Sequence, residues 1–302
     1  MTFSCRKEIE FLTQAWNGPR MEDGRPMVST EILDKIRKFT LEECWGYIYH
    51  HGYKYQFQGD FWRTNPDPNF RLVGRAVTAV LMPTRPDLFE VMTNQANKEG
   101  RRGTFNQMII ESLVEDDVLV VDFFDKVRDG TFVGGNLSTA IKTRTKRGGA
   151  VLWGGVRDME QIIKIEGLQI MHRGEDPTAI AEYVMIGLNA PCRIGNAVCL
   201  PGDVVYASQS GVIFIPAHLA EGVVVSGEKS KVRDIFGFIR LQSRKYTNAQ
   251  IDRSWTTEIM TDFIDWIGKA PEAESYRYLT WENELEQAKE ADKTQHIGEV
   301  RV

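Results

Sequence analysis

The stretch GGNLSTAIKTRTKRGGAVLWGGVRD, residues 134–158, decides the fold prediction. A helix is expected over 138–147, because glycine pairs stand before and after it. The run AVLW at 150–153 has the apolar character of a buried strand. A helix of ten residues advances roughly 15 Å, and a strand of four or five residues returns roughly 13–16 Å. Arg157 and Asp158 are therefore predicted to lie beside the glycine-rich loop that opens the stretch.

Strands and helices alternate around this stretch. LVGRAVTAVLMP at 72–83 and DVLVVDFF at 117–124 have the composition of strands, and the second is typical of a buried sheet. A helix is expected at 159–165, followed by the strand LQIM at 168–171. From residue 191 the pattern changes to short strands broken by PGD and SQSG turns. The alternation of the middle section predicts an α/β fold.

Both ends of the chain indicate helices. Apolar residues recur at helical spacing over 8–17 and 31–45, and again over 255–267. The charged segment ENELEQAKEADKTQ, at 282–295, is predicted to be a solvated face or a frayed tail. We therefore expect an N-terminal helical and aromatic arm (1–71), a core domain (72–229) and a C-terminal helical extension (230–302).

Composition limits the class of protein. Of the 302 residues, 42% are hydrophobic and 26% are charged, which is typical of a globular domain. The net charge of −5 disfavours a general nucleic-acid binder. The four cysteines show no CxxC spacing, and no run of 18 apolar residues occurs. We expect a cytoplasmic protein with neither a nucleic-acid nor a membrane partner.

The glycine-rich loop and the Arg-Asp pair suit a small anionic substrate. The loop expected to bind it consists of Gly134, Gly135, Asn136 and Leu137. The free N–H groups at the start of the following helix favour an anion, and the Arg157 guanidinium can hold a carboxylate through two bonds. Asp158 could hold Mg²⁺ or Mn²⁺. Together these groups describe a site for a 2-oxo acid. A simpler interpretation stays open, in which the glycines only connect elements and the Arg-Asp pair is a helix cap with a surface ion pair.

The same residues resemble a known family. GGNLSTAIKTRTKRGGAVLWGGVRDMEQI is similar to the central signature of the RraA-like family, which includes 4-hydroxy-4-methyl-2-oxoglutarate aldolases and the ribonuclease regulator RraA. PGDVVYASQSGVIFIPAHLAEGVV resembles its second signature. The likeness covers roughly residues 72–225.

The resemblance implies a β/β/α core assembled as a homotrimer or as a hexamer built from two trimers, with active sites at subunit interfaces. By the same resemblance, Arg157 and the main-chain amides of Gly135, Asn136 and Leu137 bind the substrate carboxylate, and Asp158 holds the Mg²⁺ or Mn²⁺. The implied function is that of a class II pyruvate aldolase or oxaloacetate decarboxylase, a lyase that acts through a metal-stabilised enolate.

Some features depart from the family pattern and leave alternatives open. Gln161, with Glu160 beside it, stands where the aldolases usually have an acidic residue. The alternatives are a sugar-acid dehydratase or aldolase with the same metal site, and a noncatalytic RraA-type regulatory protein. Glu258 or Asp262 of the extension could serve in proton transfer, although a helix that buries its apolar side is the simpler interpretation. His172 could contact substrate or be an ordinary buried histidine.

Overall fold

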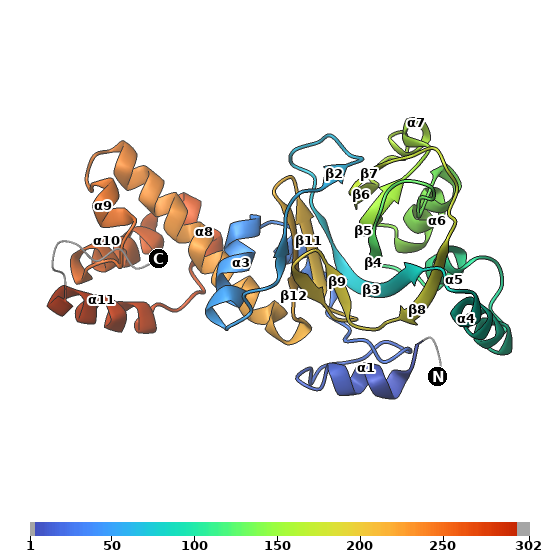
Figure 1. The fold of residues 1–302 in the computed structure, drawn as a ribbon. Coiled ribbons are helices and arrows are strands. Elements are labelled where there is room, and N and C mark those ends of the chain that lie inside the picture. The colour runs from blue at the N-terminus through green and yellow to red at the C-terminus, as the bar shows by residue number, and fades with distance from the viewer. Residues whose placement is uncertain (1–3, 295–302) are drawn as a thin grey trace. The chain divides into compact units, whose positions relative to one another are not determined.

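A computed structural model describes residues 4–294, and its contacts divide the chain into two compact units, Met1–Val224 and Val225–Val302. The division falls within α8 (Ala220–Gln242), and the N-terminal arm belongs to the same unit as the core (Figure 1). None of the described helices is both long and apolar enough to cross a membrane.

The first unit is built on a sheet that the described residues form from ten strands, in the order β1-β12-β11-β3-β4-β5-β6-β2, with β7 beside β5 and β8 beside β3. Its strands are β1 (Phe57–Gln58), β2 (Trp62–Arg63), β3 (Leu72–Pro83), β4 (Asp117–Lys126), β5 (Gly149–Val156), β6 (Gln169–His172), β7 (Gly174–Glu175), β8 (Tyr183–Leu188), β11 (Val204–Ser208) and β12 (Gly211–Ile215). A separate antiparallel pair consists of β9 (Cys192–Ile194) and β10 (Ala197–Cys199).

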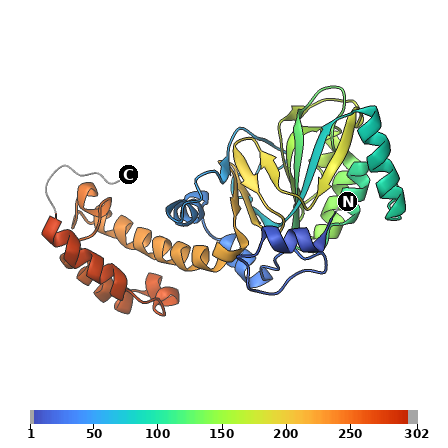
Figure 2. The same ribbon diagram turned by 60° about the horizontal axis from the view of Figure 1, so that its bottom comes forward.

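The middle of the sheet is parallel. β3, β4, β5 and β6 run in one direction, whereas β8 and β11 pair with β3 in the opposite direction. The helices between the parallel strands are α4 (Pro86–Lys98), α5 (Phe105–Glu111), α6 (Gly135–Thr145) and α7 (Met159–Ile162). Figure 2 shows α4 and α6, coloured teal and green, on one side of the sheet. The α/β prediction is confirmed, and β3 has the predicted bounds.

Alternating side chains fill the space on the two faces of the sheet. Leu119, Val121 and Phe123 of β4 belong to the cluster shared with α5, α6 and α7. Val118 and Val120 of the same strand belong to a second cluster, which contains residues of β9 and β10. Each face of β4 is therefore covered, which explains its nearly continuous apolar sequence.

The arm contains α1 (Arg6–Leu12), α2 (Thr30–Ile36) and α3 (Leu41–His50). The prediction of one helix over 31–45 is wrong. Thr40 forms a capping box with Glu43, in which the Glu43 N–H donates to Thr40 Oγ1 at 3.2 Å and the Thr40 N–H donates to Glu43 Oε2 at 2.7 Å. This reciprocal cap begins a new helix, so the apolar pattern is divided between two short helices.

A buried ion pair joins the arm to the core. The Arg25 guanidinium donates to both carboxylate oxygens of Asp117, at 2.9 and 3.1 Å, and to Asp23 at 2.6 Å. The side chains of Arg25 and Asp117 are 2% and 0% exposed. Because two charges so deeply buried are costly unless paired, the position of the loop that carries Arg25 depends on Asp117 at the start of β4.

The second unit is helical and contains α9 (Asn248–Ile251), α10 (Thr257–Lys269), the 3₁₀ helix η2 (Pro271–Tyr276) and α11 (Glu282–Thr294), besides most of α8. Trp255, Ile259 and Phe263 are buried, as predicted from their spacing. The charged segment is mostly exposed, but it is a regular helix because Ala288 is buried and Lys229 Nζ lies 2.6 Å from Glu284 Oε1. Its last predicted residue, Gln295, lies outside the described residues.

Candidate active site

Two loops meet at the carboxyl end of β5. Val133 forms a parallel bridge with Val156, and the Arg157 N–H donates to the Val133 carbonyl oxygen at 3.0 Å. The Phe132 N–H donates to the Gly155 carbonyl oxygen at 2.9 Å. These main-chain bonds bring the loop before α6 against the residues that follow β5, as the lengths of the helix and strand predicted.

Arg157, Asp158 and Gly135 contact one another at this point. Arg157 Nη1 donates to Asp158 Oδ2 at 2.7 Å, and the main-chain N–H of Gly135 donates to the same oxygen at 3.1 Å. The side chains of Arg157 and Asp158 are 34% and 28% exposed. Arg157 and Gly135 therefore hold Asp158 Oδ2 where solvent reaches the site.

Side chains from the next loop and from α7 lie close to the two glycines of this loop. A Cβ atom at position 134 would collide with Asp158 Oδ2 and lie 3.0 Å from the Arg157 guanidinium carbon. A Cβ atom at position 135 would collide with Gln161 Oε1. Gly134 has an extended backbone with φ −129°, so the glycines make room for side chains rather than relieving backbone strain.

The start of α6 supplies further donors. The first main-chain bond of the helix runs from the Ser138 N–H to the Gly134 carbonyl oxygen, at 3.0 Å. The N–H groups of Gly135, Asn136 and Leu137 therefore precede the internal bonds of the helix and point out of its end. The helix dipole adds partial positive charge there, so this end of α6 favours an anion.

Asp158 has a left-handed backbone, with φ 59° and ψ 37°, a conformation that aspartate tolerates better than most residues. Although it precedes α7, its side chain makes no capping hydrogen bond to that helix. The capping part of the simpler interpretation is therefore wrong, whereas the ion pair between Arg157 and Asp158 is present.

Asp158 offers one carboxylate oxygen to a hard divalent cation. Within the described residues, no three or more His, Cys, Asp or Glu side chains are grouped for a metal ion. Arg157 and Gly135 both bind Oδ2 of Asp158, which leaves Oδ1 for a cation. Mg²⁺ usually keeps several waters and takes only one or two protein carboxylates, so a single half-exposed aspartate suits it, whereas Zn²⁺ requires more nitrogen or sulfur ligands.

The sequence model of the RraA-like family, described as Aldolase/RraA, matches residues 30–214. The chain belongs to the RraA-like family. The matched region contains both loops of the candidate site, whereas α1, the loop with Arg25 and the helical second unit lie outside it.

Relatives within the family are shorter than this chain. A protein of Ectopseudomonas mendocina, provisionally named 4-hydroxy-4-methyl-2-oxoglutarate aldolase, is 27% identical over 157 residues, which cover 48% of this chain and 96% of the relative. A Pseudomonas aeruginosa protein with the same provisional name is 28% identical over 156 residues, covering 47% and 96%.

Solved structures show the same fold. An unusual RraA-family protein of Streptomyces coelicolor, described with the RNase ES inhibitor family, has a TM-score of 0.59 at 21% identity and covers 71% of this chain and 100% of its own. An uncharacterised protein of Pseudomonas syringae pv. tomato has a TM-score of 0.61 at 18% identity, covering 78% and 98%. Together with the family match, these likenesses confirm the RraA-like fold class.

Other residues singled out from the sequence have different surroundings. The Gln161 side chain lies over Gly135 at the RraA-like site, and Glu160 is exposed. His172 is fully buried, its Nδ1 lies 3.1 Å from the Gly174 carbonyl oxygen, and burial lowers its pKa to about 4. It is therefore a neutral buried histidine in this structure. Asp262 forms ion pairs with Arg240 and Lys245 inside the second unit.

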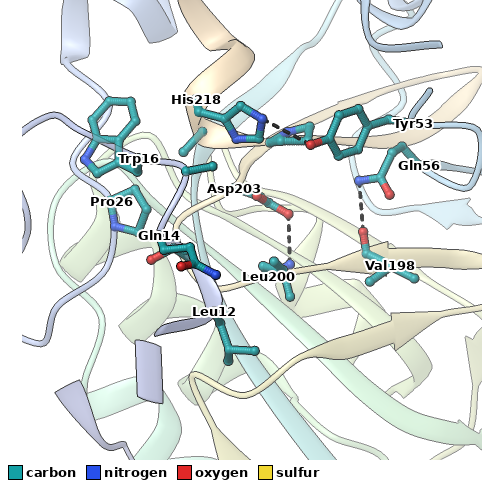
Figure 3. Close-up of a pocket in the computed structure, with 14 residues that line it drawn as sticks. Leu12, Gln14, Trp16, Pro26, Tyr53, Gln56, Val198, Leu200, Asp203 and His218 are labelled. Atoms are coloured by element: carbon teal, nitrogen blue, oxygen red, sulfur yellow. Dashed lines mark hydrogen bonds between the residues drawn. The ribbon is translucent and has the colours of Figure 1, made fainter. Parts of the chain in front are cut away.

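The first unit of this RraA-like protein also contains a cavity of about 370 Å³, which the sequence did not indicate (Figure 3). It lies against Asp203 of the PGD turn, together with Tyr53 and His218, whose Oη and Nε2 atoms are 3.1 Å apart. The PGD motif was the available signal, but these residues come from segments far apart in the chain. Their meeting could not be deduced from local spacing.

Proposed function

We propose that this protein is a divalent-cation-dependent lyase that acts on a 2-oxo acid, as a 4-hydroxy-2-oxo acid aldolase, an oxaloacetate decarboxylase or both. One observation carries the proposal. Arg157 Nη1 and the Gly135 N–H both donate to Asp158 Oδ2, at 2.7 and 3.1 Å. Two donors with this geometry are suited to the carboxylate of an external acid.

Arg157 would hold the acid through its planar guanidinium, and the outward N–H groups of residues 135–137 would bind the remaining carboxylate charge. Gly134 and Gly135 would let the Asp158 and Gln161 side chains lie close to the loop, because a Cβ at either position would collide with them. A cation on Asp158 would supply positive charge beside the 2-oxo oxygen.

This arrangement suits cleavage of the bond between C3 and C4. In a 4-hydroxy-2-oxo acid the C4 hydroxyl gives its proton to a water molecule or hydroxide in the solvent-accessible site, the bond breaks, and a carbonyl fragment leaves. In oxaloacetate the same bond breaks with loss of CO₂. Either way the electron pair passes to the 2-oxo group, and a proton then adds at C3 to give pyruvate. Arg157 and the start of α6 fix the acid end throughout, so the reacting bond keeps its orientation.

The names of the relatives support this proposal, since two are provisionally named as aldolases for a 4-hydroxy-2-oxo acid. Asp158, Arg157 and the glycine loop all lie in the region that the family model matches. We also propose a homotrimer or a hexamer of two trimers, with a small 2-oxo acid as the substrate and with no nucleic-acid or membrane partner.

The test is release of pyruvate, coupled to lactate dehydrogenase, from oxaloacetate and from 4-hydroxy-4-methyl-2-oxoglutarate with Mg²⁺, Mn²⁺ or EDTA. We expect activity with either cation and none above background in EDTA. Arg157→Lys keeps the charge but loses the planar fork, so KM should rise about tenfold or more. Asp158→Asn should abolish most activity and weaken Mn²⁺ binding by about 10- to 100-fold or more.

Glu160→Gln is the matched control, because Glu160 is exposed and adjacent to the site in sequence. It should leave pyruvate release and Mn²⁺ binding unchanged. The proposal fails if the cation-loaded protein releases no pyruvate from either substrate and Asp158→Asn binds Mn²⁺ as the unmodified protein does.

A further inference from the structure

The N-terminal arm lines one side of the cavity of about 370 Å³ (Figure 3). Residues 12–16, after and at the end of α1, form one wall, and Pro26 adjoins them. The opposite side contains Val198, Leu200 and Asp203. Residues 12–26 lie outside the region 30–214 that the family model matches, so the N-terminal segment beyond the match supplies one side of the cavity.

The wall from the arm is held in place by hydrogen bonds. Arg20 Nη1 donates to Thr13 Oγ1 and to the Gly24 carbonyl oxygen, both at 2.8 Å, and Nη2 donates to the Thr13 carbonyl oxygen at 3.0 Å. The Trp16 indole N–H donates to the Pro19 carbonyl oxygen at 2.7 Å. These hydrogen bonds fix Thr13 and Trp16 on this side of the cavity.

Asp203 is the charged group of the cavity. It is 5% exposed, and its Oδ2 accepts the Leu200 N–H at 2.8 Å. Burial raises its pKa to about 7, against hydrogen bonds from the main chain at Leu200 and Ala217. Among the described residues, no Lys or Arg side chain lines the cavity. An anion such as a 2-oxo acid would therefore be disfavoured here.

The rest of the lining is mainly apolar and aromatic. Leu12, Trp16, Val198 and Leu200 supply apolar surface, and Tyr53 supplies an aromatic ring. Burial lowers the pKa of His218, so its ring is neutral at neutral pH and does not repel a cation. A carboxyl group beside aromatic rings suits a positively charged head on an apolar body.

We propose that this cavity binds a small organic amine, with its ammonium group beside Asp203 and an aromatic or branched apolar body against Trp16, Val198 and Leu200. The ammonium group of the ligand would be the positively charged partner of the Asp203 carboxylate. This site is separate in chemistry from the proposed lyase site, which takes an anion, so neither proposal depends on the other.

The probe is 2-phenylethylamine, compared with the uncharged 2-phenylethanol and the anionic 3-phenylpropionate by calorimetric titration at pH 8, where the Asp203 carboxyl is ionised. A charge-assisted hydrogen bond should make the amine bind about tenfold or more tighter than the alcohol. The anion should show no measurable binding. Equal affinity for amine and alcohol, or no binding of the amine, would overturn the proposal.

Two variants locate the binding. Asp203→Asn should bring the amine to the affinity of the alcohol. Because Asp203 also accepts main-chain hydrogen bonds and this variant could fold poorly, Ala15→Trp provides a second test: Ala15 lines the cavity from the exposed surface of the arm, and the indole should block amine binding. Asn17→Trp, at an exposed position that does not line the cavity, is the control and should bind normally. Undiminished binding by Ala15→Trp would also overturn the proposal.

Discussion

At the scale of single residues, Asp158 has the most consequential contacts. Its carboxylate accepts hydrogen bonds from Arg157 and Gly135, the same donors that the proposed function assigns to the carboxylate of the substrate. Asp158 and an anionic substrate would therefore compete for these donors. A cation that draws the Asp158 carboxylate toward itself would free them.

This competition gives the first prediction. Asp158→Asn keeps the size of the side chain but removes its charge, so Arg157 should become available to an external anion. In EDTA, the variant should bind pyruvate about tenfold or more tighter than the unmodified protein, the change expected when one charged hydrogen-bond acceptor is removed. Calorimetric titration measures the difference, and Glu160→Gln should show none. Equal or weaker pyruvate binding by Asp158→Asn would contradict the competition.

His172 gives a prediction about pH. Its pKa is about 4 in the folded protein and 6.5 for the unperturbed side chain. Between these two pH values the unfolded chain is protonated at this residue and the folded chain is not. Stability is retained above pH 6.5 and is lost as the pH falls toward 4. The full difference is about 3 kcal/mol. Urea unfolding at pH 7 and pH 4.5 should show a smaller loss for His172→Gln than for the unmodified protein; parallel losses would rule out this role.

The site residues could be predicted from sequence only where the spacing along the chain determines which residues come together. Arg157 and Asp158 were placed beside Gly135 because one helix and one strand connect them. Asp203, Tyr53 and His218 meet across 165 residues of chain, from Tyr53 to His218, and no periodicity encodes that contact. The internal carboxylate contact of Asp158 also depends on side-chain distances that a sequence does not contain.

At the scale of elements, the start of α6 depends on the absence of a side chain at Gly134. Gly134→Ala should displace the Asp158 and Arg157 side chains, because the new Cβ would collide with Asp158 Oδ2. We expect Mn²⁺ and pyruvate to bind about tenfold or more weakly, given the narrow tolerance of positioned groups. Gly46→Ala is the control, since a Cβ there meets no atom within 4 Å. Unchanged binding of both ligands by Gly134→Ala would show that the close approach is unimportant.

Element prediction succeeded where composition and boundaries agree. β3 matched because its β-branched run ends at Pro83, and α10 matched because its apolar side is buried. The helix expected over 31–45 is divided, since the capping box at Thr40 competes with a continuous apolar pattern. α11 is a helix because its Glu, Leu, Gln, Ala and Lys residues favour helices and because Ala288 packs on one side.

At the scale of the whole molecule, the buried Arg25–Asp117 pair links the arm to the sheet. Asp117→Ala leaves the Arg25 guanidinium, 2% exposed, without its main partner, so the free energy of unfolding should fall by about 3–5 kcal/mol. Urea unfolding followed by circular dichroism measures the change. Asp87→Ala, which breaks the exposed Arg85–Asp87 pair, is the control and should unfold like the unmodified protein. Equal stability of the two variants would mean that the Arg25–Asp117 pair does not help to hold the arm.

The same ion pair has a consequence for how this lineage can change. Asp117 lies inside the matched family region and Arg25 lies outside it, so this buried pair ties a residue of the shared fold to the N-terminal segment beyond the match. A descendant that lost this segment would leave Asp117 buried without its bidentate partner, with Arg75 3.9 Å away, until position 117 also mutated. The segment with Arg25 and Asp117 should therefore be gained and lost together, because loss of the segment alone would destabilise the fold.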